Sequence, residues 1–378
     1  MSDPLRILHL IDKTLLTTGS VVQMMEAARV LAGRGHRVAI ASRRGSDLRE
    51  ACAAAGVQFF SLPLRGPLDL RSAWRLRQRL HDELTDVIHV YKGGPHSVAL
   101  LAALGLGSRP VLVVNRGVSF PLDTVNRYKY RHPRVKAVVC VADAVRELVI
   151  ETGRLDPRRV YTIHGGTDCT VFDPTTIDAA EARRGLGFGH QNLVIGQVSV
   201  RDWKGWSHLV HAFKLVAESY PAARLLFVGC EPAAERLKVE EASRAAGVSG
   251  RVVTLPFRRD LPCVLAACDV VVDASVAGTG ITGSIREAMA LERAVVATDC
   301  GGNRELVGDG ETGLVVPPGD VGALAEALTR LFDDPALRRR LGAAARKRVL
   351  GHFTTEQRVD KLEALYRKVL GSVESFEF

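Results

Sequence analysis

The chain has 378 residues, of which 47% are hydrophobic and 25% are charged. This length predicts two domains, each with enough apolar side chains to form a core. No apolar run approaches the roughly 20 residues of a membrane-spanning helix, which argues against such a segment. The net charge of +9 lies entirely in the first half, where residues 1–168 hold 25 Lys and Arg against 15 Asp and Glu. A one-sided basic domain predicts an anionic partner: a membrane surface, a phosphorylated acceptor or nucleic acid.

The N-terminal segment MSDPLRILHLIDK has only a short apolar run with a charge inside it, so we expect a first strand here and not a secretory signal. The seven cysteines are scattered and include no CxxC pair. Scattered cysteines of this kind usually serve as small apolar residues in proteins of a reducing compartment, and we therefore expect a cytoplasmic protein.

Strand-like runs alternate with amphipathic helices along the first half. Residues 6–11 form the first predicted strand, and a turn at residues 17–20 leads into a helix that ends near Gly33 and Gly35. Further strands are expected at 37–42, 57–64, 86–91, 110–115 and 137–142. This alternation predicts a parallel sheet that is covered by helices on both faces.

The second half restarts the same pattern, with strands expected at 193–200, 223–229, 251–257, 270–275, 294–299 and 313–317. The predicted fold class is therefore α/β, with two Rossmann-like, doubly wound domains facing a central cleft. We expect a basic N-terminal domain over 1–168, a linker over 169–190, a C-terminal domain over 191–353, and a terminal helix and tail over 354–378. The apolar stripe of that helix must dock, and we expect the helix to cross back to the N-terminal domain.

A glycine-rich loop follows the strand that ends at Ser275. Gly280 and Gly283 permit tight turns and close approach of a ligand to the backbone, while Thr282 and Ser284 can cap the next helix or bind phosphate oxygens. The free N–H groups at that helix N-terminus form an anion site, and Glu287 lies one turn further on. An ordinary strand–loop–helix crossover explains the same pattern equally well.

Two cations follow the strand over 193–200. Arg201 and Lys204 stand before the next helix, at the edge of a parallel sheet where ligands bind. An arginine fork and a lysine charge together can neutralise a diphosphate leaving group. The alternative is a pair of solvated surface charges.

Together these stretches resemble the retaining nucleotide-sugar glycosyltransferases of the GT-B fold, family GT4 (glycosyl transferases group 1). The resemblance covers nearly the whole chain and rests on LAGRGHRVAIAS (31–42), HGGTDCTVFDP (164–174), WKGWSHLVHAF (203–213) and, above all, EAMALERAVVATDCGGNRELVGDGETGLVVPPGD (287–320). It implies transfer of a sugar from a nucleotide-diphosphate sugar to a carbohydrate or glycolipid acceptor, such as a lipopolysaccharide precursor of the cell envelope.

The resemblance also implies roles for individual residues. Arg201, Lys204 and Glu287 would be the catalytic set, with the two cations on the donor diphosphate and Glu287 on the ribose hydroxyls. The donor-binding set would hold the phosphates, the sugar and the base; it comprises Gly19, Ser20, Phe257, Arg258, Thr279, Gly280, Thr282, Gly283 and Ser284. No metal and no cofactor are implied, because the cations do the work of a metal ion.

Two positions depart from the family pattern. Members usually carry a first Glu eight residues before the second, and Thr279 stands there in this chain. Arg116 stands where the family has the His of a His-Gly turn, so it cannot act as a base. It remains a candidate to bind an anionic group, and we expect acceptor contacts from Arg116, Lys92 and His96 at the strand ends of the N-terminal domain.

Two basic stretches, 71–84 and 126–136, are candidates for contact with an anionic membrane. The favoured interpretation for the first is an ordinary domain helix with Trp74 packed inside and its arginines outside. Peripheral contact with the inner face of the cytoplasmic membrane is the alternative. Nucleic acid is not expected, since no recognised nucleic-acid fold accompanies the charge.

Two other functions remain open. A sugar-nucleotide epimerase shares the two-domain architecture but needs acid and base groups that Thr279 and Arg116 do not supply. A non-catalytic nucleotide-sugar binding protein is the second alternative, motivated by the same two residues. An NAD dehydrogenase is not expected, because no GxGxxG follows a strand with an acidic residue about 20 positions on.

Overall fold

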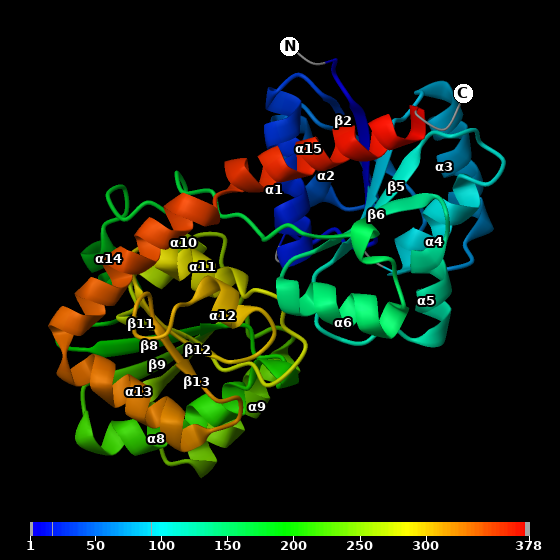
Figure 1. Cartoon of the computed structure of the whole chain (residues 1–378). Helices are drawn as coiled ribbons and strands as arrows, with labels where there is room; N and C mark the ends of the chain where they lie inside the picture. Colours follow the sequence, from blue (N-terminus) through cyan, green and yellow to red (C-terminus); the bar gives the residue numbers. More distant parts are fainter. Residues whose placement is uncertain (1–2, 17, 92, 375–378) are drawn as a thin grey trace. The chain divides into compact units, whose positions relative to one another are not determined.

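The computed structural model describes residues 3–16, 18–91 and 93–374, and the chain divides into two compact units. The first unit contains the residues up to Gly166 and those from Thr355 onward, and the second unit spans Thr167–Thr354. Residues 169–190, expected as a linker, lie in the second unit and include the helix α7 (Ala179–Gly185). Each unit is an α/β domain with its own parallel sheet, as the sequence predicted (Figure 1).

The sheet of the first unit has the strand order β3-β2-β1-β4-β5-β6-β7, and every neighbouring pair is parallel. Its strands are β1 (Arg6–Leu10), β2 (Arg37–Ser42), β3 (Gln58–Ser61), β4 (Val87–Val90), β5 (Val111–Arg116), β6 (Val135–Cys140) and β7 (Val160–Thr162). The strand order reverses between β1 and β4. In doubly wound sheets this switch point is where ligands bind.

Helices cover both faces of this sheet. They are α1 (Gly19–Gly33), α2 (Ser46–Ala54), α3 (Leu70–Asp82), α4 (Gly93–Ala102), α5 (Thr124–Arg131), α6 (Asp143–Gly153), the 3₁₀ turn η1 (Pro157–Arg159) and α15 (Thr355–Glu374). The last of these confirms the expected return of the terminal helix, because α15 packs on α1 within the first unit (Figure 1).

A buried polar cluster joins α15 to this sheet. His9 and His89 lie side by side on β1 and β4, and the hydroxyl of Tyr366 on α15 lies 2.6 Å from Nδ1 of His89. Arg358, also on α15 and only 5% exposed, donates to the carbonyl oxygen of Gln23 on α1. Burial, reinforced by the Arg358 charge, lowers the pKa of His9 to about 3, so this imidazole is neutral. The terminal helix is therefore held by polar contacts as well as by apolar packing.

The second sheet has the order β10-β9-β8-β11-β12-β13 and is also parallel throughout. Its strands are β8 (Leu193–Val198), β9 (Ala223–Val228), β10 (Val252–Leu255), β11 (Val270–Asp273), β12 (Ala294–Thr298) and β13 (Leu314–Val316). The order reverses between β8 and β11, which places the switch point at their carboxyl ends.

Successive residues of β11 show why these strands are continuous apolar runs. Val270 and Val272 enter one core together with side chains of α8 and α13, whereas Val271 enters the opposite core with α11 and α14. The helical segments of this unit, in addition to α7, are η2 (Asp202–Lys204), α8 (Trp206–Ser219), α9 (Ala233–Ala245), η3 (Ser249–Arg251), α10 (Leu261–Ala266), α11 (Gly283–Ala290), α12 (Asn303–Leu306), α13 (Val321–Asp333) and α14 (Pro335–His352).

The basic helix α3 differs from the favoured expectation. Ala73, Leu76 and Leu80 form its buried stripe, and Trp74 is 59% exposed instead of packed inside. Leu70 at the helix start is 69% exposed, so an apolar surface faces outward among the arginines of this helix. None of the described helices is long and apolar enough to cross a bilayer.

Candidate functional site

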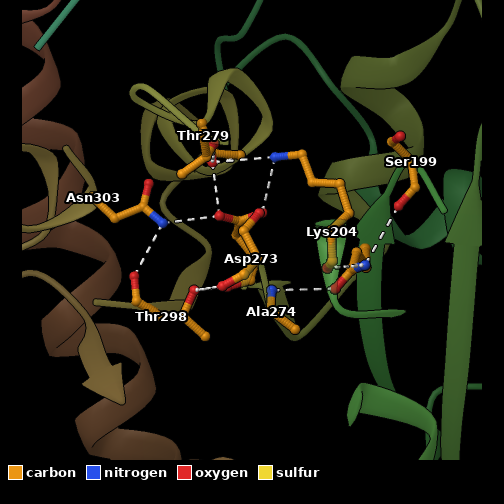
Figure 2. A network of polar contacts seen from close by, with 10 residues as sticks. Ser199, Lys204, Asp273, Ala274, Thr279, Thr298 and Asn303 are labelled. Carbon is orange, nitrogen blue, oxygen red and sulfur yellow. Dashed lines mark hydrogen bonds and ion pairs between the residues drawn. The ribbon is translucent and has the colours of Figure 1, made fainter. Parts of the chain in front are cut away.

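Three connections meet at the carboxyl edge of the second sheet, at its switch point. They are the turn after β8 that holds Lys204, the end of β11 with the loop that follows it, and the turn from β12 into α12. Side chains from all three form one hydrogen-bonded network in the centre of Figure 2. The sequence analysis placed its catalytic residues and the glycine-rich part of its donor set at two of these connections.

Lys204 is held by two features of its own turn. Gly205 follows it with φ +60°, and a Cβ atom there would lie 1.9 Å from the carbonyl oxygen of Ala274 at the end of β11. Only glycine allows this approach and this backbone conformation together. The turn thereby brings the Lys204 ammonium to 3.1 Å from Oδ1 of Asp273 and 3.4 Å from Oγ1 of Thr282.

Asp273, like Asn303, belongs to this network and was not among the site residues predicted from the sequence. Its side chain is 2% exposed, and its carboxylate accepts from Lys204, Ser275, Thr282 and Asn303. Burial by itself would raise the pKa of Asp273, but the Lys204 charge and the three neutral donors outweigh it, so the pKa lies below its usual value. The sequence signal that could have identified Asp273 is its acidic side chain at the end of the apolar run VVVD (270–273).

The glycine-rich loop lies over this network. Thr279 and Thr282 are both buried, and their hydroxyls are 3.1 Å apart. The loop is fixed from the other side by the turn after β12, where the N–H of Gly302 donates to the carbonyl oxygen of Gly280. Gly301, with φ +59°, approaches so closely that an added Cβ would lie 2.0 Å from the carbonyl oxygen of Thr279.

The N-terminus of α11 has no side-chain cap. Thr282 occupies the cap position, but its hydroxyl donates to Asp273 instead of accepting from the helix. The first N–H groups of α11, at Gly283 and Ser284, are therefore available to an anion. The uncapped helix start agrees with the free N–H groups expected from the sequence, and phosphate or sugar binding by this loop stays a prediction.

Glu287 lies one turn into α11 and is half-buried. Within the described part of the chain its carboxylate has no hydrogen bond, and its Oε1 lies 3.7 Å from the position of a Cβ on Gly283. Burial raises the pKa of Glu287, against the opposing charge of Arg286. A half-buried acceptor next to free N–H groups suits a ligand hydroxyl.

Arg201 is exposed, and its guanidinium lies over the ring of Trp203 at 5.3 Å. It makes no ion pair with any described residue, so its charge is available to a ligand. Phe257 and Arg258 follow β10, and the Arg258 guanidinium forms two hydrogen bonds with Asp260. That ion pair raises the pKa of Arg258 and engages its side chain within the segment expected to hold the base.

In the first unit, Gly19 and Ser20 begin α1 after the first strand of the switch point. Gly19 has open space at its Cα, and the Ser20 hydroxyl has no hydrogen bond among the described residues. The predicted acceptor residue Lys92 lies outside the described residues. Gly19 is exposed, whereas the Ser20 hydroxyl is buried without a hydrogen bond among the described residues.

The two remaining acceptor candidates are engaged within the first unit. His96 is fully buried in α4 against the edge of Tyr130, and burial lowers its pKa to about 3, with smaller contributions from Lys129 and His132. An acceptor cannot touch His96 in this structure, which corrects that expectation. Arg116 ends β5, is partly exposed, and donates to the carbonyl oxygen of Phe120.

Both halves of the chain match models of glycosyltransferase families. Residues 17–171 match the model described as Glycosyltransferase Family 4, and residues 190–334 match the one described as Glycosyl transferases group 1. The first match ends at residue 171, close to the unit boundary that follows Gly166, and the second match lies within the second unit, Thr167–Thr354.

Curated relatives include the α-maltose-1-phosphate synthase of Mycolicibacterium smegmatis, 33% identical over 62% of this chain and 63% of that protein. The D-inositol 3-phosphate glycosyltransferase of Mycobacterium bovis BCG is 30% identical over 73% of this chain, and 57% of its own length is spanned. The chain thus spans about six tenths of these two proteins. An Escherichia coli enzyme named UDP-Gal:α-D-GlcNAc-diphosphoundecaprenol α-1,3-galactosyltransferase is 24% identical over 79% of each chain.

Solved structures show the same fold over the full length. A glycosyltransferase from Rickettsia africae superposes with a TM-score of 0.86 at 20% identity, covering 98% of this chain and 99% of that one. The Anabaena protein HepE in complex with UDP-glucose gives a TM-score of 0.82 at 20% identity, covering 97% and 99%.

Proposed function

Since the chain is a glycosyltransferase with the two-domain GT-B fold, we propose that it transfers a sugar from a nucleotide-diphosphate sugar to a carbohydrate or glycolipid acceptor. The observation that carries the proposal is the edge of the second sheet, where Lys204, Arg201, the uncapped start of α11 and Glu287 belong to adjacent connections. The UDP-glucose complex of HepE supports a donor of this chemical class.

The chemistry proposed for this edge is stabilisation of the departing nucleotide diphosphate. Arg201, Lys204 and the N–H groups of α11 oppose the negative charge that develops when the glycosyl bond breaks. Glu287 accepts hydrogen bonds from ribose hydroxyls, and the backbone at Phe257 holds the base. The acceptor hydroxyl passes its proton to the departing phosphate oxygen on the same face of the sugar, so the anomeric configuration is retained.

Removal of the Lys204 ammonium tests the donor site. We expect Lys204→Ala to lower kcat/KM for transfer by about 10²–10³-fold, because one preorganised charge contact is lost. The measurement is nucleotide release on addition of acceptor, with Lys214→Ala, an exposed lysine on α8, as matched control. Equal kcat/KM in the two variants would contradict the assignment.

Two further measurements separate sugar transfer from the alternative functions, epimerisation and non-catalytic binding. NMR of a nucleotide sugar without acceptor would show a new epimer if the chain were an isomerase, and calorimetry would show binding without transfer if it were a binding protein. Proton couplings of the product's anomeric centre report retention. We also propose that no metal ion takes part, so added EDTA should leave the transfer rate unchanged.

The acceptor proposal uses the exposed face of α3. Leu70 and Trp74 are exposed beside Arg71 and Arg75, a combination that binds anionic lipid surfaces. We propose that this face contacts the membrane that holds a glycolipid acceptor; the E. coli relative is named for a lipid-linked acceptor of this kind.

Vesicle flotation tests this contact. We expect binding to vesicles with anionic lipid to exceed binding to neutral vesicles, and the excess to disappear when Arg71 and Arg75 are both changed to Glu. The control changes Arg339 and Arg340 on α14 to Glu, an equal charge change at exposed positions of the second unit. Equal flotation of both variants would overturn the proposal.

A further inference from the structure

Asp273 has every position around its carboxylate occupied. Oδ1 accepts from the Lys204 ammonium at 3.1 Å and from the Ser275 hydroxyl at 2.8 Å. Oδ2 accepts from the Thr282 hydroxyl at 2.7 Å and from the Asn303 amide at 2.9 Å (Figure 2). With 2% of the side chain exposed, this carboxylate acts on the neighbouring residues and not on a ligand.

These four donors come from all three connections at the sheet edge. Lys204 belongs to the turn after β8, Thr282 to the glycine-rich loop, and Asn303 to the start of α12. Asn303 is itself fixed, because its amide also donates to the carbonyl oxygen of Thr298 at the end of β12. The carboxylate thus sets the relative positions of the three segments that meet at the proposed donor site.

The effect on Lys204 follows from counting its donors. An ammonium group has three N–H bonds, and Asp273 and Thr282 accept two of them. The side chain is 16% exposed, so the third N–H is the one available to a ligand. A lysine held in this way has lost its rotamer freedom before a sugar donor binds. The entropy cost of ordering its side chain is therefore not added to the activation free energy of transfer.

The same contacts fix the direction of a hydrogen bond. Thr282 has a single hydroxyl proton, which it donates to Asp273 while accepting from Lys204. The bond between the Thr282 and Thr279 hydroxyls must then be donated by Thr279. Thr279 therefore offers only an acceptor to a ligand, as the carboxylate of the family's first Glu would.

We propose that Asp273 is a positioning residue for sugar transfer: it aligns Lys204 toward the donor diphosphate and makes Thr279 an acceptor. The proposal rests on the proposed function of this edge. A structural tie alone would not call for a charge, because a buried ion pair is often no more stabilising than apolar side chains of similar size.

A double-mutant cycle with Lys204 tests the coupling. We expect Asp273→Asn to lower kcat/KM about 10²-fold, mostly through kcat, and to cause a further loss of at most about 10-fold when Lys204 is already Met. In that background Asp273 has no ammonium group to position, and only its effect through Thr282 and Thr279 remains. Multiplication of the two losses, or wild-type kcat/KM in Asp273→Asn, would overturn the proposal.

A second variant covers the case in which Asp273→Asn does not fold. Thr282→Val keeps the ion pair and the side-chain shape but removes the hydroxyl that contacts both Lys204 and Thr279. We expect a loss of about 10-fold in kcat/KM and a cooperative thermal transition at a somewhat lower temperature, because the buried Asp273 carboxylate loses one donor; unchanged kcat/KM would overturn the proposal.

Calorimetric titration with UDP and GDP separates this inference from the proposed function. The nucleotide that the wild type binds should bind at least 10-fold more weakly to Asp273→Asn, and equal affinity would count against the positioning role. A wild-type chain that binds the nucleotide but transfers no sugar to any acceptor would instead overturn the proposed function and leave this comparison valid.

Discussion

Gly205 meets two structural requirements of the site, a left-handed backbone conformation and close contact with β11. Its left-handed backbone ends the turn that carries Lys204, and its missing side chain admits the carbonyl oxygen of Ala274. A methyl group there would force β11 and the start of α8 apart, and with them Lys204 and Asp273.

We expect Gly205→Ala to destabilise the second unit by about 3 kcal/mol, since backbone strain and overpacking each cost about 1–2 kcal/mol. Gly247→Ala is the matched control, because Gly247 has φ +75° and nothing within 4 Å of an added Cβ. That control should show the strain alone, about 1 kcal/mol. Urea unfolding measures both, and equal losses would show that the close approach to Ala274 carries no cost.

At the residue scale, the sequence predicted site residues where each one lies within a short continuous motif of its own. Arg201, Lys204 and Glu287 follow strand ends, so their edge of the sheet could be deduced from the α/β pattern. Asp273 could not be paired with Lys204, because 69 positions separate them and their contact depends on how two strands lie in the sheet. His96 was misjudged for a similar reason: its helix buries it against Tyr130, a residue of α5.

At the scale of elements, the strands were predictable because the central ones are buried on both faces and therefore largely apolar. The edge strands β3 and β10 are only partly buried, but they too lie within largely apolar runs of the sequence. The orientation of α3 was not predictable, since its sequence has two apolar stripes. Packing uses the stripe of Ala73, Leu76 and Leu80, and leaves Trp74 outside.

The buried histidines of the first unit predict sensitivity to acid. Burial lowers the pKa of His9 and of His96 to about 3, whereas an unfolded histidine binds its proton near pH 6.5. Between these values the unfolded chain binds more protons, so stability is full above about pH 6.5 and falls as the pH decreases toward 3. At pH 5 each histidine should cost about 2 kcal/mol.

A substitution at His96 measures the contribution of this one histidine to the pH dependence of stability. His96→Phe keeps the edge contact with Tyr130 and removes two ring nitrogens that have no hydrogen bond among the described residues. We expect the free energy of unfolding to depend less on pH between 5 and 6.5, by about one proton. His81→Gln, at a side chain that is 82% exposed, is the control; a slope unchanged by His96→Phe would refute the assignment.

At the scale of the whole molecule, the predicted donor contacts of Lys204, Arg201 and Glu287 all belong to the second unit. A nucleotide diphosphate should therefore stabilise that unit by about 2.7 kcal/mol at 100 times its Kd. Calorimetric scans of the full chain should show a shift in the transition of the second unit, and Lys204→Ala should abolish the shift. A ligand-induced shift retained in that variant would contradict the donor site.

The first unit is discontinuous in sequence, since α15 completes it from the far end of the chain. A ribosome therefore synthesises every residue of the second unit before it makes the helix that covers α1. Until Tyr366 and Arg358 have been synthesised, the first unit lacks their contacts with His89 and with α1. Domains generally fold as units, so the first unit cannot complete its fold before that point. A chain that ends before α15 therefore has every residue of the second unit but lacks the helix that completes the first.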